Sequence, residues 1–501
     1  MERETQLSTG LAAEQQERLQ RTLRRFDIVF LLIAAVVSIE VLGQISSYGG
    51  ETVTWIVILA ITFLVPYAMV FAEIGALFSD EGGPYVWVKV AFGRAVAAVS
   101  TILYWVTTPV WIGGSMAFLA YETWTGFIGH LPEGGMADYA FKLVFIWITV
   151  SSAIVSLRYG KWLPTVGAIA KVAMLALFVV TTVIYAFQHG AAGIGFSDLS
   201  PSLIGFLGLT PVLLFAFLGF ESGNAAGGEM QDAGRDVPAS LARSASVAAA
   251  CYLIPILAIL VVLPESQITG IGGLMDAIGT VYSVYGAAGD PLLTLTAVAF
   301  IVVLIGQGGA WMIVSDRTQA TAAADGAFYG GYFGVFSKRL GTPLRVNVLT
   351  GLVASAFLVA TMQIVEGTAA AVFAVVLTVC ISTYLMSYLV IIPSAARLRR
   401  MRGDATTYRL PFSDRGFAAL CYVATAWIVL GTWVALFPGT LERLAGVTYD
   451  FETIWGVSRG TFESLTLGTL VFLAVLGLVG YVRARPVREQ VRRTERPMER
   501  T

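Results

Sequence analysis

Glu221 stands in the middle of an apolar segment of membrane-spanning length, with Gly219 before it and Gly223 after it. A carboxylate at bilayer depth is energetically costly, so such a residue usually faces a cavity or the interior of a helix bundle and takes part in transport. The two glycines weaken helical hydrogen bonding, and a helix that breaks at mid-membrane is tolerated where its freed backbone groups line a polar site. The pattern predicts that Glu221 lies near a central binding site.

Two further charged residues fall deep within apolar segments. Glu40 lies in the first of them, in the run Ser-Ile-Glu-Val-Leu-Gly at 38–43, and Lys171 lies deep in another. A buried ammonium group needs partners, which either a carboxylate or the free carbonyl groups of a broken helix can supply. We therefore expect Glu40 and Lys171 to belong to the same polar centre as Glu221.

The sequence shows no motif that is typical of an enzyme. It contains no nucleotide-binding loop, no nucleophile with a base and no metal-ligand spacing. Its three cysteines, Cys251, Cys380 and Cys421, lie in apolar runs, where they are expected as small core residues. We expect a protein that is not an enzyme, with no cofactor, no bound metal and no nucleic-acid partner.

The elements that position these residues are predicted to be membrane-spanning helices. The chain has 501 residues, of which 56% are hydrophobic and 13% are charged, against roughly a quarter charged in globular proteins. Apolar runs of about 20 residues, the length that crosses the hydrocarbon core, alternate with short polar connections. About twelve spans are predicted, at 27–49, 53–78, 95–124, 140–157, 163–187, 203–229, 239–263, 292–321, 345–363, 369–396, 416–437 and 465–482.

The distribution of basic residues indicates how the spans are oriented. Lys and Arg are concentrated in the tails and in alternate connections, while the other side carries Lys142, Arg443 and Arg459. Basic residues mark the cytoplasmic side of membrane proteins. Since an even number of spans leaves both termini on one side, the chain is expected in the cell membrane with both termini in the cytoplasm.

The first and sixth predicted spans share a feature that suggests an internal repeat. Each has a glutamate beside small residues near its middle, Glu40 in one and Glu221 in the other. Paired interruptions at matching positions of two five-helix halves are typical of inverted-repeat transporters and mark their binding site.

Three groups of residues resemble motifs of one known family, in the family's own order. The first comprises Ala-Glu-Ile-Gly at 72–75, Gly-Gly-Pro-Tyr at 82–85 and Ala-Phe-Gly at 91–93. The second comprises Gly-Phe-Glu-Ser at 219–222 and Arg-Asp-Val-Pro at 235–238, and the third Gly-Gly-Ala-Trp at 308–311 with Asp-Gly at 325–326. Together they make the chain similar to the permeases and amino acid/amine antiporters of the amino acid, polyamine and organocation (APC) superfamily.

The resemblance implies an all-α polytopic fold of the leucine-transporter type. Helices one to five and six to ten form inverted repeats, helices one and six are broken, and two peripheral helices follow. The implied divisions are a cytoplasmic tail at 1–26, the first repeat at 27–188, the second at 203–396, a cytoplasmic loop with helices eleven and twelve at 397–482, and a cytoplasmic tail at 483–501.

The resemblance also implies where the substrate binds. Phe215 matches a gating aromatic residue of helix six, and Trp311 an aromatic residue of helix eight that floors the site; Tyr104, Thr107 and Thr108 match a wall in helix three. Tyr85 is expected as an aromatic gate at the membrane boundary. The other expected substrate-binding residues flank the breaks: Ser38, Ile39, Glu40, Val41 and Gly43 in the first, and Ala216, Leu218 and Gly219 in the second.

The first helix departs from the family pattern. Many members have Gly-Ser-Gly or Gly-Ala-Gly at the break, where free amides bind the substrate carboxylate, but this chain has Ser38, Ile39 and Glu40. Three interpretations of Glu40 are open. It binds the ammonium group of a cationic substrate, it carries a coupled proton, or it pairs permanently with a basic residue such as Lys171.

Two further roles follow from the resemblance. Lys171 resembles a helix-five lysine that occupies the place of a sodium ion in several members, which implies sodium independence with proton coupling or exchange instead. Glu221 matches an acid that acid-resistance exchangers use as a pH-sensitive group.

Three other acids, Glu73, Glu229 and Asp316, lie near predicted cytoplasmic ends. We expect them to form gate ion pairs with Lys89, Arg94, Arg235 or Arg317.

The sequence thus predicts a secondary active permease that moves amino acids by alternating access. Glu221, Glu40 and Lys171 are its expected coupling residues. The alternatives are a polyamine or biogenic amine permease of the same fold, which Glu40 favours, and a sensor that does not transport. The expected partners are a small amino acid or amine and the lipid bilayer, and the expected assembly is a monomer or a homodimer.

Overall fold

The computed structural model describes residues 25–77, 83–159, 162–191, 195, 197–222, 233–337, 339–364, 369–402 and 408–495. Every regular element in these ranges is a helix, and 10 helical stretches are long and apolar enough to cross a membrane. Helices suit this role because they satisfy their backbone hydrogen bonds internally. The predicted all-α polytopic class is confirmed, while the total of twelve spans and the inverted repeat stay predictions.

The long helical elements follow the predicted spans with small shifts at their ends. They are α4–η2–α5 (Glu51–Leu59, Ala60–Leu64, Val65–Leu77), α7–η3–α8 (Arg94–Trp111, Ile112–Met116, Ala117–Phe127), α9 (Met136–Tyr159), α10 (Trp162–His189), α13 (Ala233–Val262), α15 (Gly289–Ala324), α16 (Leu344–Ile364), α17 (Ala369–Arg402), α18 (Asp414–Leu436) and α21 (Arg459–Arg483). Most residues of α7 and of α17 are buried, so these two helices lie in the interior of the bundle.

Two further apolar segments are too short to cross a membrane as single helices, because each is interrupted. The first consists of α2 (Arg25–Val36), the short η1 (Ile39–Val41) and α3 (Leu42–Ser46), with Ser38 in a non-helical conformation (φ −91°, ψ 88°). The second, α11 (Leu203–Phe217), ends where Leu218 becomes extended and Gly219 adopts φ 120°. Both interruptions therefore occur where the sequence predicts them.

Gly219 is required at its position for two reasons. A positive φ of this size strains any residue with a side chain. In addition, a Cβ atom there would lie 3.1 Å from the ring of Trp311 and 3.2 Å from the side chain of Val36. The second break therefore packs directly against the end of α2 and against α15.

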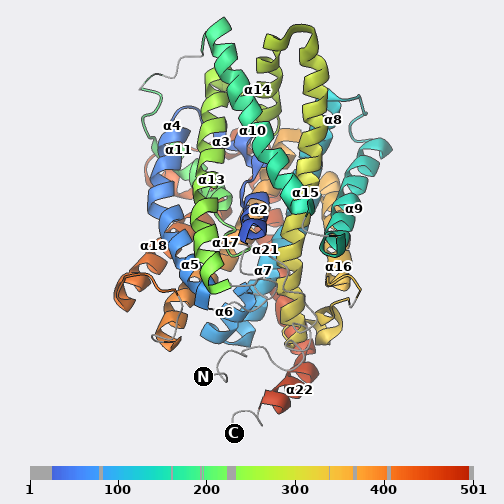
Figure 1. Cartoon of the computed structure of the whole chain (residues 1–501), viewed down its shortest axis with the longest axis vertical. Coiled ribbons are helices and arrows are strands. Elements are labelled where there is room, and N and C mark those ends of the chain that lie inside the picture. Colours follow the sequence, from blue (N-terminus) through green and yellow to red (C-terminus); the bar gives the residue numbers. More distant parts are fainter. Residues whose placement is uncertain are drawn as a thin grey trace.

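Figure 1 shows the helices upright and side by side, with α6 (Gly83–Phe92) and α22 (Arg485–Glu495) at one end of the bundle and α14 (Gly273–Tyr282) toward the other. We call these the α22 end and the α14 end. Gly286, in η6 (Ser283–Ala288), turns the chain from α14 into α15. α2 packs against α10, α13 and α15, so the first break lies among these three helices.

Several short helices were not predicted. They are α6, α14, α22, α19 (Thr440–Leu444), α20 (Phe451–Trp455), η5 (Glu265–Gln267) and η7 (Tyr329–Gly334). Each is at most 11 residues long, too short to register as a span. Residues 1–24, 223–232, 403–407 and 496–501, which hold Gly223, Glu229 and most of the predicted tails, lie outside the described residues.

Candidate functional site

The break in the first helix leaves backbone carbonyl groups without helical partners, and Lys171 of α10 takes up two of them. Its ammonium group donates to the carbonyl oxygen of Ala34 at 3.0 Å and to that of Val37. It also donates to Oε1 of Gln307, on α15, at 2.7 Å. The side chain is fully enclosed, at 1% exposure. The predicted link between Lys171 and the broken helix is thus present, and it runs through carbonyl groups.

The carbonyl groups between those two are also satisfied by side chains. Trp311 donates its indole N–H to the carbonyl of Ala35 at 2.8 Å. Tyr252, on α13, donates its hydroxyl to the carbonyl of Val36 at 2.7 Å and accepts from the amide of Ser38 at 2.8 Å. Four consecutive carbonyl groups, 34–37, are therefore held by α10, α13 and α15, which explains how the break persists in a buried position.

Glu40 is buried beside this cluster, and Gln307 connects it to Lys171. The Gln307 amide group donates to both carboxylate oxygens of Glu40, at 3.2 and 3.0 Å, and to the hydroxyl of Ser38 at 3.3 Å. The same side chain accepts from Lys171 through its oxygen. The amide of Gln307 thus bridges the two charged groups, and the three interpretations of Glu40 stay predictions.

Glu221 lies in the second break, fully buried, and is surrounded by hydroxyl groups of tyrosines. Tyr67 of α5 donates to Oε2 at 2.8 Å, while Tyr104 of α7 and Tyr384 of α17 donate to Oε1 at 2.8 and 3.1 Å. Tyr388 extends the cluster, 3.0 Å from the hydroxyl of Tyr384. Phenol hydroxyls donate to a carboxylate and accept from a carboxylic acid, so this cluster accommodates both protonation states.

Tyr67 joins this cluster to the backbone of the break. Its hydroxyl accepts from the amides of Gly219 and Phe220 at 3.0 and 3.3 Å while it donates to Glu221. Two N–H groups of the break are thereby occupied by the protein itself.

Four aromatic rings close a cycle between the two breaks. Trp111 contacts Phe215 and Trp311, with ring centroids 6.0 and 6.1 Å apart, and Tyr384 contacts the same two rings at 5.6 and 5.5 Å. The interplanar angles lie between 72° and 89°, so neighbouring rings are nearly perpendicular. We call these four residues the aromatic cycle. Rings arranged in this way present faces that attract cations.

The aromatic cycle touches both breaks and both polar clusters. Trp311 holds the Ala35 carbonyl of the first break, and Tyr384 donates to Glu221 in the second. The indole N–H of Trp111 is a buried donor with no hydrogen-bond partner among the described residues. An unsatisfied buried donor is costly, so it marks a position where a bound molecule could supply the acceptor.

The remaining predicted wall and break residues are buried around this centre. Thr107 lies 3.0 Å from the hydroxyl of Thr383, and Thr108 donates to Ser315 at 2.9 Å, so these two side chains connect α7 to α17 and α15. Gly43 packs against the carbonyl oxygens of Thr269 and Gly270. The other four, Ile39, Val41, Ala216 and Leu218, are at most 1% exposed. Their contact with substrate stays a prediction.

An ionic cluster fastens the α22 end. Asp325, which follows α15, accepts from Tyr85 at 2.5 Å and pairs with Lys89 at 3.0 Å and with Arg94 at 2.9 Å. Burial acts to raise the pKa of Asp325, but Lys89 and Arg94, with the hydrogen bond from Tyr85, hold that pKa below its usual value. Tyr85, predicted as a gate, therefore ties α6 to the end of α15.

The predicted gate pairs of two other acids are wrong. Glu73 pairs with Arg399 of α17 at 2.8 Å. Asp316 accepts hydrogen bonds from the neutral groups of Trp105, Thr350 and Asn347, at 3.0, 2.7 and 2.6 Å. Hydropathy places an acid along a span but does not reveal which neighbouring helix faces it.

Six residues of the site were missed in the sequence: Tyr67, Trp111, Tyr252, Gln307, Tyr384 and Tyr388. One signal for them exists, since Tyr384 and Tyr388 are four residues apart in a predicted span and so share one helix face. Within the described part of the chain, no group of three or more His, Cys, Asp or Glu side chains could hold a metal ion.

Comparison with known proteins identifies relatives along most of the chain. Residues 23–453 match the model of the family described as "Amino acid permease". An "Uncharacterized transporter" of Legionella pneumophila is 24% identical over 406 residues, covering 79% of this chain and 84% of that protein. The "Probable agmatine/putrescine antiporter AguD" of Lactococcus lactis is 26% identical over 410 residues, covering 81% and 85%. The "Methylthioribose transporter" of Bacillus subtilis is 23% identical over 370 residues, covering 70% and 78%.

Proposed function

The chain belongs to the amino acid permease family of the APC superfamily, and from this premise we propose that it is a secondary active transporter that moves amino acids or related amines across the cell membrane by alternating access. The two interrupted segments, α2–α3 and α11 with its continuation, count as spans one and six of twelve. Helices one to five and six to ten then form the inverted repeats, with the divisions expected from the sequence.

The observation that carries this proposal is the meeting of both breaks at the aromatic cycle. Discontinuous helices at mid-membrane are typical of the substrate sites of secondary transporters. Here the cycle lies between them, with the carboxylate of Glu221 hydrogen-bonded to Tyr384 on one side and Trp311 bonded to the first break on the other. Substrate binds within the cycle, and Phe215 and Trp311 act as its gates.

The ionic cluster around Asp325 suits a gate that closes the α22 end during alternating access. Its ties among α6, α7 and α15 hold the α22 end shut, and that end is cytoplasmic because α22 is rich in arginine. Opening toward the cytoplasm breaks these ion pairs while the first and sixth helices rock against α7 and α15. Both termini then lie in the cytoplasm.

Lys171 makes transport independent of sodium. Its ammonium group already donates hydrogen bonds to the carbonyl oxygens of Ala34 and Val37. Backbone carbonyl oxygens of this kind are the ligands that a sodium ion would need. A fixed positive charge at this place leaves coupling to protons or to exchange of a second solute. Glu221 and Glu40 are the groups that take the proton or the substrate ammonium.

Two observations bear on whether the substrate is an amino acid or an amine without a carboxylate. Trp111 offers a buried N–H donor without a described partner, which suits the carboxylate of an amino acid. The amides of Ser38, Gly219 and Phe220 are instead occupied by tyrosine hydroxyls, and two carboxylates lie close by, which suits an amine that lacks a carboxylate. An amino acid is the first candidate, and a polyamine such as the substrates named for the Lactococcus lactis relative is the second.

Reconstitution into liposomes tests the proposal. Purified protein should give saturable uptake and counterflow of an amino acid or a diamine in sodium-free buffer. A transport-inactive sensor would bind such a solute without moving it, so binding without counterflow would reject the proposal.

A further inference from the structure

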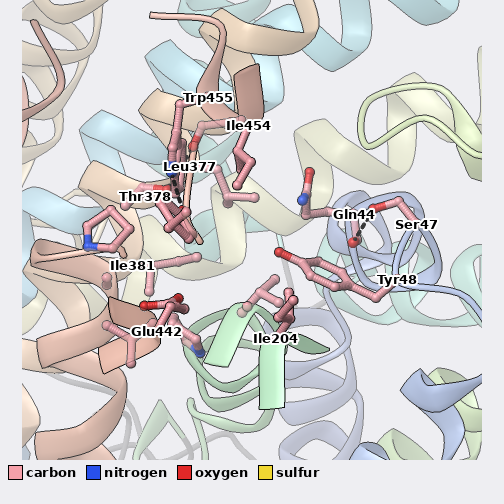
Figure 2. A pocket seen from close by; sticks show the side chains of 18 residues that line it. Gln44, Ser47, Tyr48, Ile204, Leu377, Thr378, Ile381, Glu442, Ile454 and Trp455 are labelled. Atoms are coloured by element: carbon pink, nitrogen blue, oxygen red, sulfur yellow. Dashed lines mark hydrogen bonds between the residues drawn. The ribbon is translucent and has the colours of Figure 1, made fainter. Parts of the chain in front are cut away.

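A cavity of about 370 Å³ lies at the α14 end of the molecule, outside the aromatic cycle. Its walls come from α3, α11 and α17 and from the later elements α18, α19 and α20 (Figure 2). The volume is in the range of small-molecule sites. The last three elements follow the second proposed repeat in sequence. The cavity therefore lies between the two interrupted segments and the later, peripheral part of the chain.

Two residues of the cavity wall stand close in sequence to members of the aromatic cycle. Val212 on α11 and Ile381 on α17 line it, and each stands three residues, about 4.5 Å of helix rise, before a member of the aromatic cycle, Phe215 or Tyr384. Both helices run from the α14 end toward the α22 end. The cavity therefore approaches the aromatic cycle from the α14 side along both helices.

One carboxylate in the cavity wall lacks a partner. Glu442 of α19 is 4% exposed, and Figure 2 shows its side chain at the hollow that Tyr48 and Gln44 face. Among the described residues, no hydrogen bond to this carboxylate is found and no cation lies within 4.0 Å of it. Arg459, the cation that approaches the cavity wall, donates to the carbonyl oxygen of Pro438 and pairs with Glu463. The carboxylate of an otherwise enclosed glutamate thus opens onto the cavity, where a cationic ligand could supply its partner.

Aromatic side chains complete the wall around Glu442. Trp455 donates its indole N–H to the hydroxyl of Tyr449 at 2.8 Å, which fixes both rings at the cavity. Tyr48, Tyr449 and Glu442 all line this cavity, so their polar groups surround one hollow. A carboxylate with aromatic walls is the chemistry that recognises an organic ammonium group.

We propose that this cavity is a second, outer binding site for an organic ammonium ion, with Glu442 as its counter-charge. We call the site outer, and assign it an ammonium ligand, on the basis of the proposed function. The cavity itself is separate from the central site. An incoming amine first pairs with Glu442 and then moves past Val212 and Ile381 to the aromatic cycle. The site raises the local concentration of cationic substrate at the entrance.

Equilibrium dialysis of the purified full-length protein with radiolabelled putrescine tests the proposal. The wild type should bind one equivalent more than Glu442→Gln. The matched control Glu452→Gln changes an exposed glutamate on the neighbouring α20 and should bind as many equivalents as the wild type. Thr378→Leu, which narrows the cavity from α17, should lose the same equivalent as Glu442→Gln, and this second variant guards against misfolding of the first.

The outer and central sites are distinguished by Glu221→Gln, which should leave the Glu442-dependent equivalent in place. Without amine, Glu442→Gln should melt no lower than the wild type, because among the described residues this carboxylate has no hydrogen bond or ion pair to lose. The proposal is overturned if Glu442→Gln binds as many equivalents as the wild type. It is also overturned if neither putrescine, agmatine nor arginine shows Glu442-dependent binding at millimolar concentration.

Discussion

Replacing Lys171 by methionine removes the ammonium group that holds the first break while keeping the length of the side chain. Three hydrogen bonds are lost, and the carbonyl oxygens of Ala34 and Val37 are left buried without that partner. With Oε1 of Gln307, three buried acceptors lose their partner, each at a cost of about 1–3 kcal/mol, so the gross loss is about 3–9 kcal/mol. Part of it is offset because the variant no longer buries a charge.

The lost hydrogen bonds hold the part of the first helix that contacts Trp311 of the aromatic cycle. We therefore expect both the affinity for substrate and the stability of the fold to decrease. We expect Lys171→Met to melt at a lower temperature and to bind substrate at least about 10-fold more weakly, the equivalent of about 1.4 kcal/mol. Thermal unfolding in detergent and direct substrate binding measure the two effects on the same sample.

Lys142→Met is the matched control. Lys142 is also buried, at 3% exposure, but it pairs with Asp138 on the same helix, α9, away from either break. This variant should lose stability and keep its affinity for substrate. If Lys171→Met binds substrate as tightly as the wild type, or if the two variants lose affinity equally, the assignment of Lys171 to the break is refuted.

Three further predictions concern the substrate, the cytoplasmic end and the second break. Glu40→Gln should weaken uptake of a diamine about 10-fold or more and leave a zwitterionic amino acid unaffected if the substrate is an amine, because a charge-assisted hydrogen bond contributes about 1.5–3 kcal/mol. Asp325 has a depressed pKa in the folded protein, so its stabilisation is complete above its unfolded-state pKa and is lost as the pH falls through the folded value; Asp325→Asn should lower the melting temperature at neutral pH and reduce its fall in acid. Gly219→Ala should cost about 1–3 kcal/mol through backbone strain and contact with Trp311, whereas Gly468→Ala, in a helix with open space around it, should be neutral or slightly stabilising.

Each of these predictions has a result that would contradict it. Equal losses of diamine and amino acid uptake in Glu40→Gln would remove the distinction between the substrate classes. An unchanged melting temperature of Asp325→Asn at neutral pH would show that the ion pairs at the α22 end contribute nothing. Equal melting temperatures of the two glycine variants would show that the positive φ at Gly219 is not needed.

The sequence predicts those parts of the site that leave a local mark. Glu221 and Glu40 stand out because a charge in an apolar run is rare, and the glycine beside Glu221 marks the break that the structure shows. Lys171 stands out for the same reason. Hydropathy also locates most of the long helices, since their length follows from the thickness of the bilayer.

The partners of these charges could not be predicted, because they depend on how the helices rotate against one another. Tyr67 and Tyr388 look like ordinary aromatic residues of apolar spans, yet one donates to Glu221 and the other completes its cluster. Glu73 and Arg399 are far apart in the sequence and pair across α5 and α17. Spacing within one span carries no information about which face of another span it meets.

The most direct test of the central claim is the pH dependence of uptake in liposomes that contain either the wild type or Glu221→Gln. Uptake of substrate, without sodium, is measured over a series of imposed pH gradients. If Glu221 is the charged group of the transport site, the wild type responds to the gradient and the variant loses that response. Uptake in Glu221→Gln that follows the pH gradient as the wild type does would contradict the account.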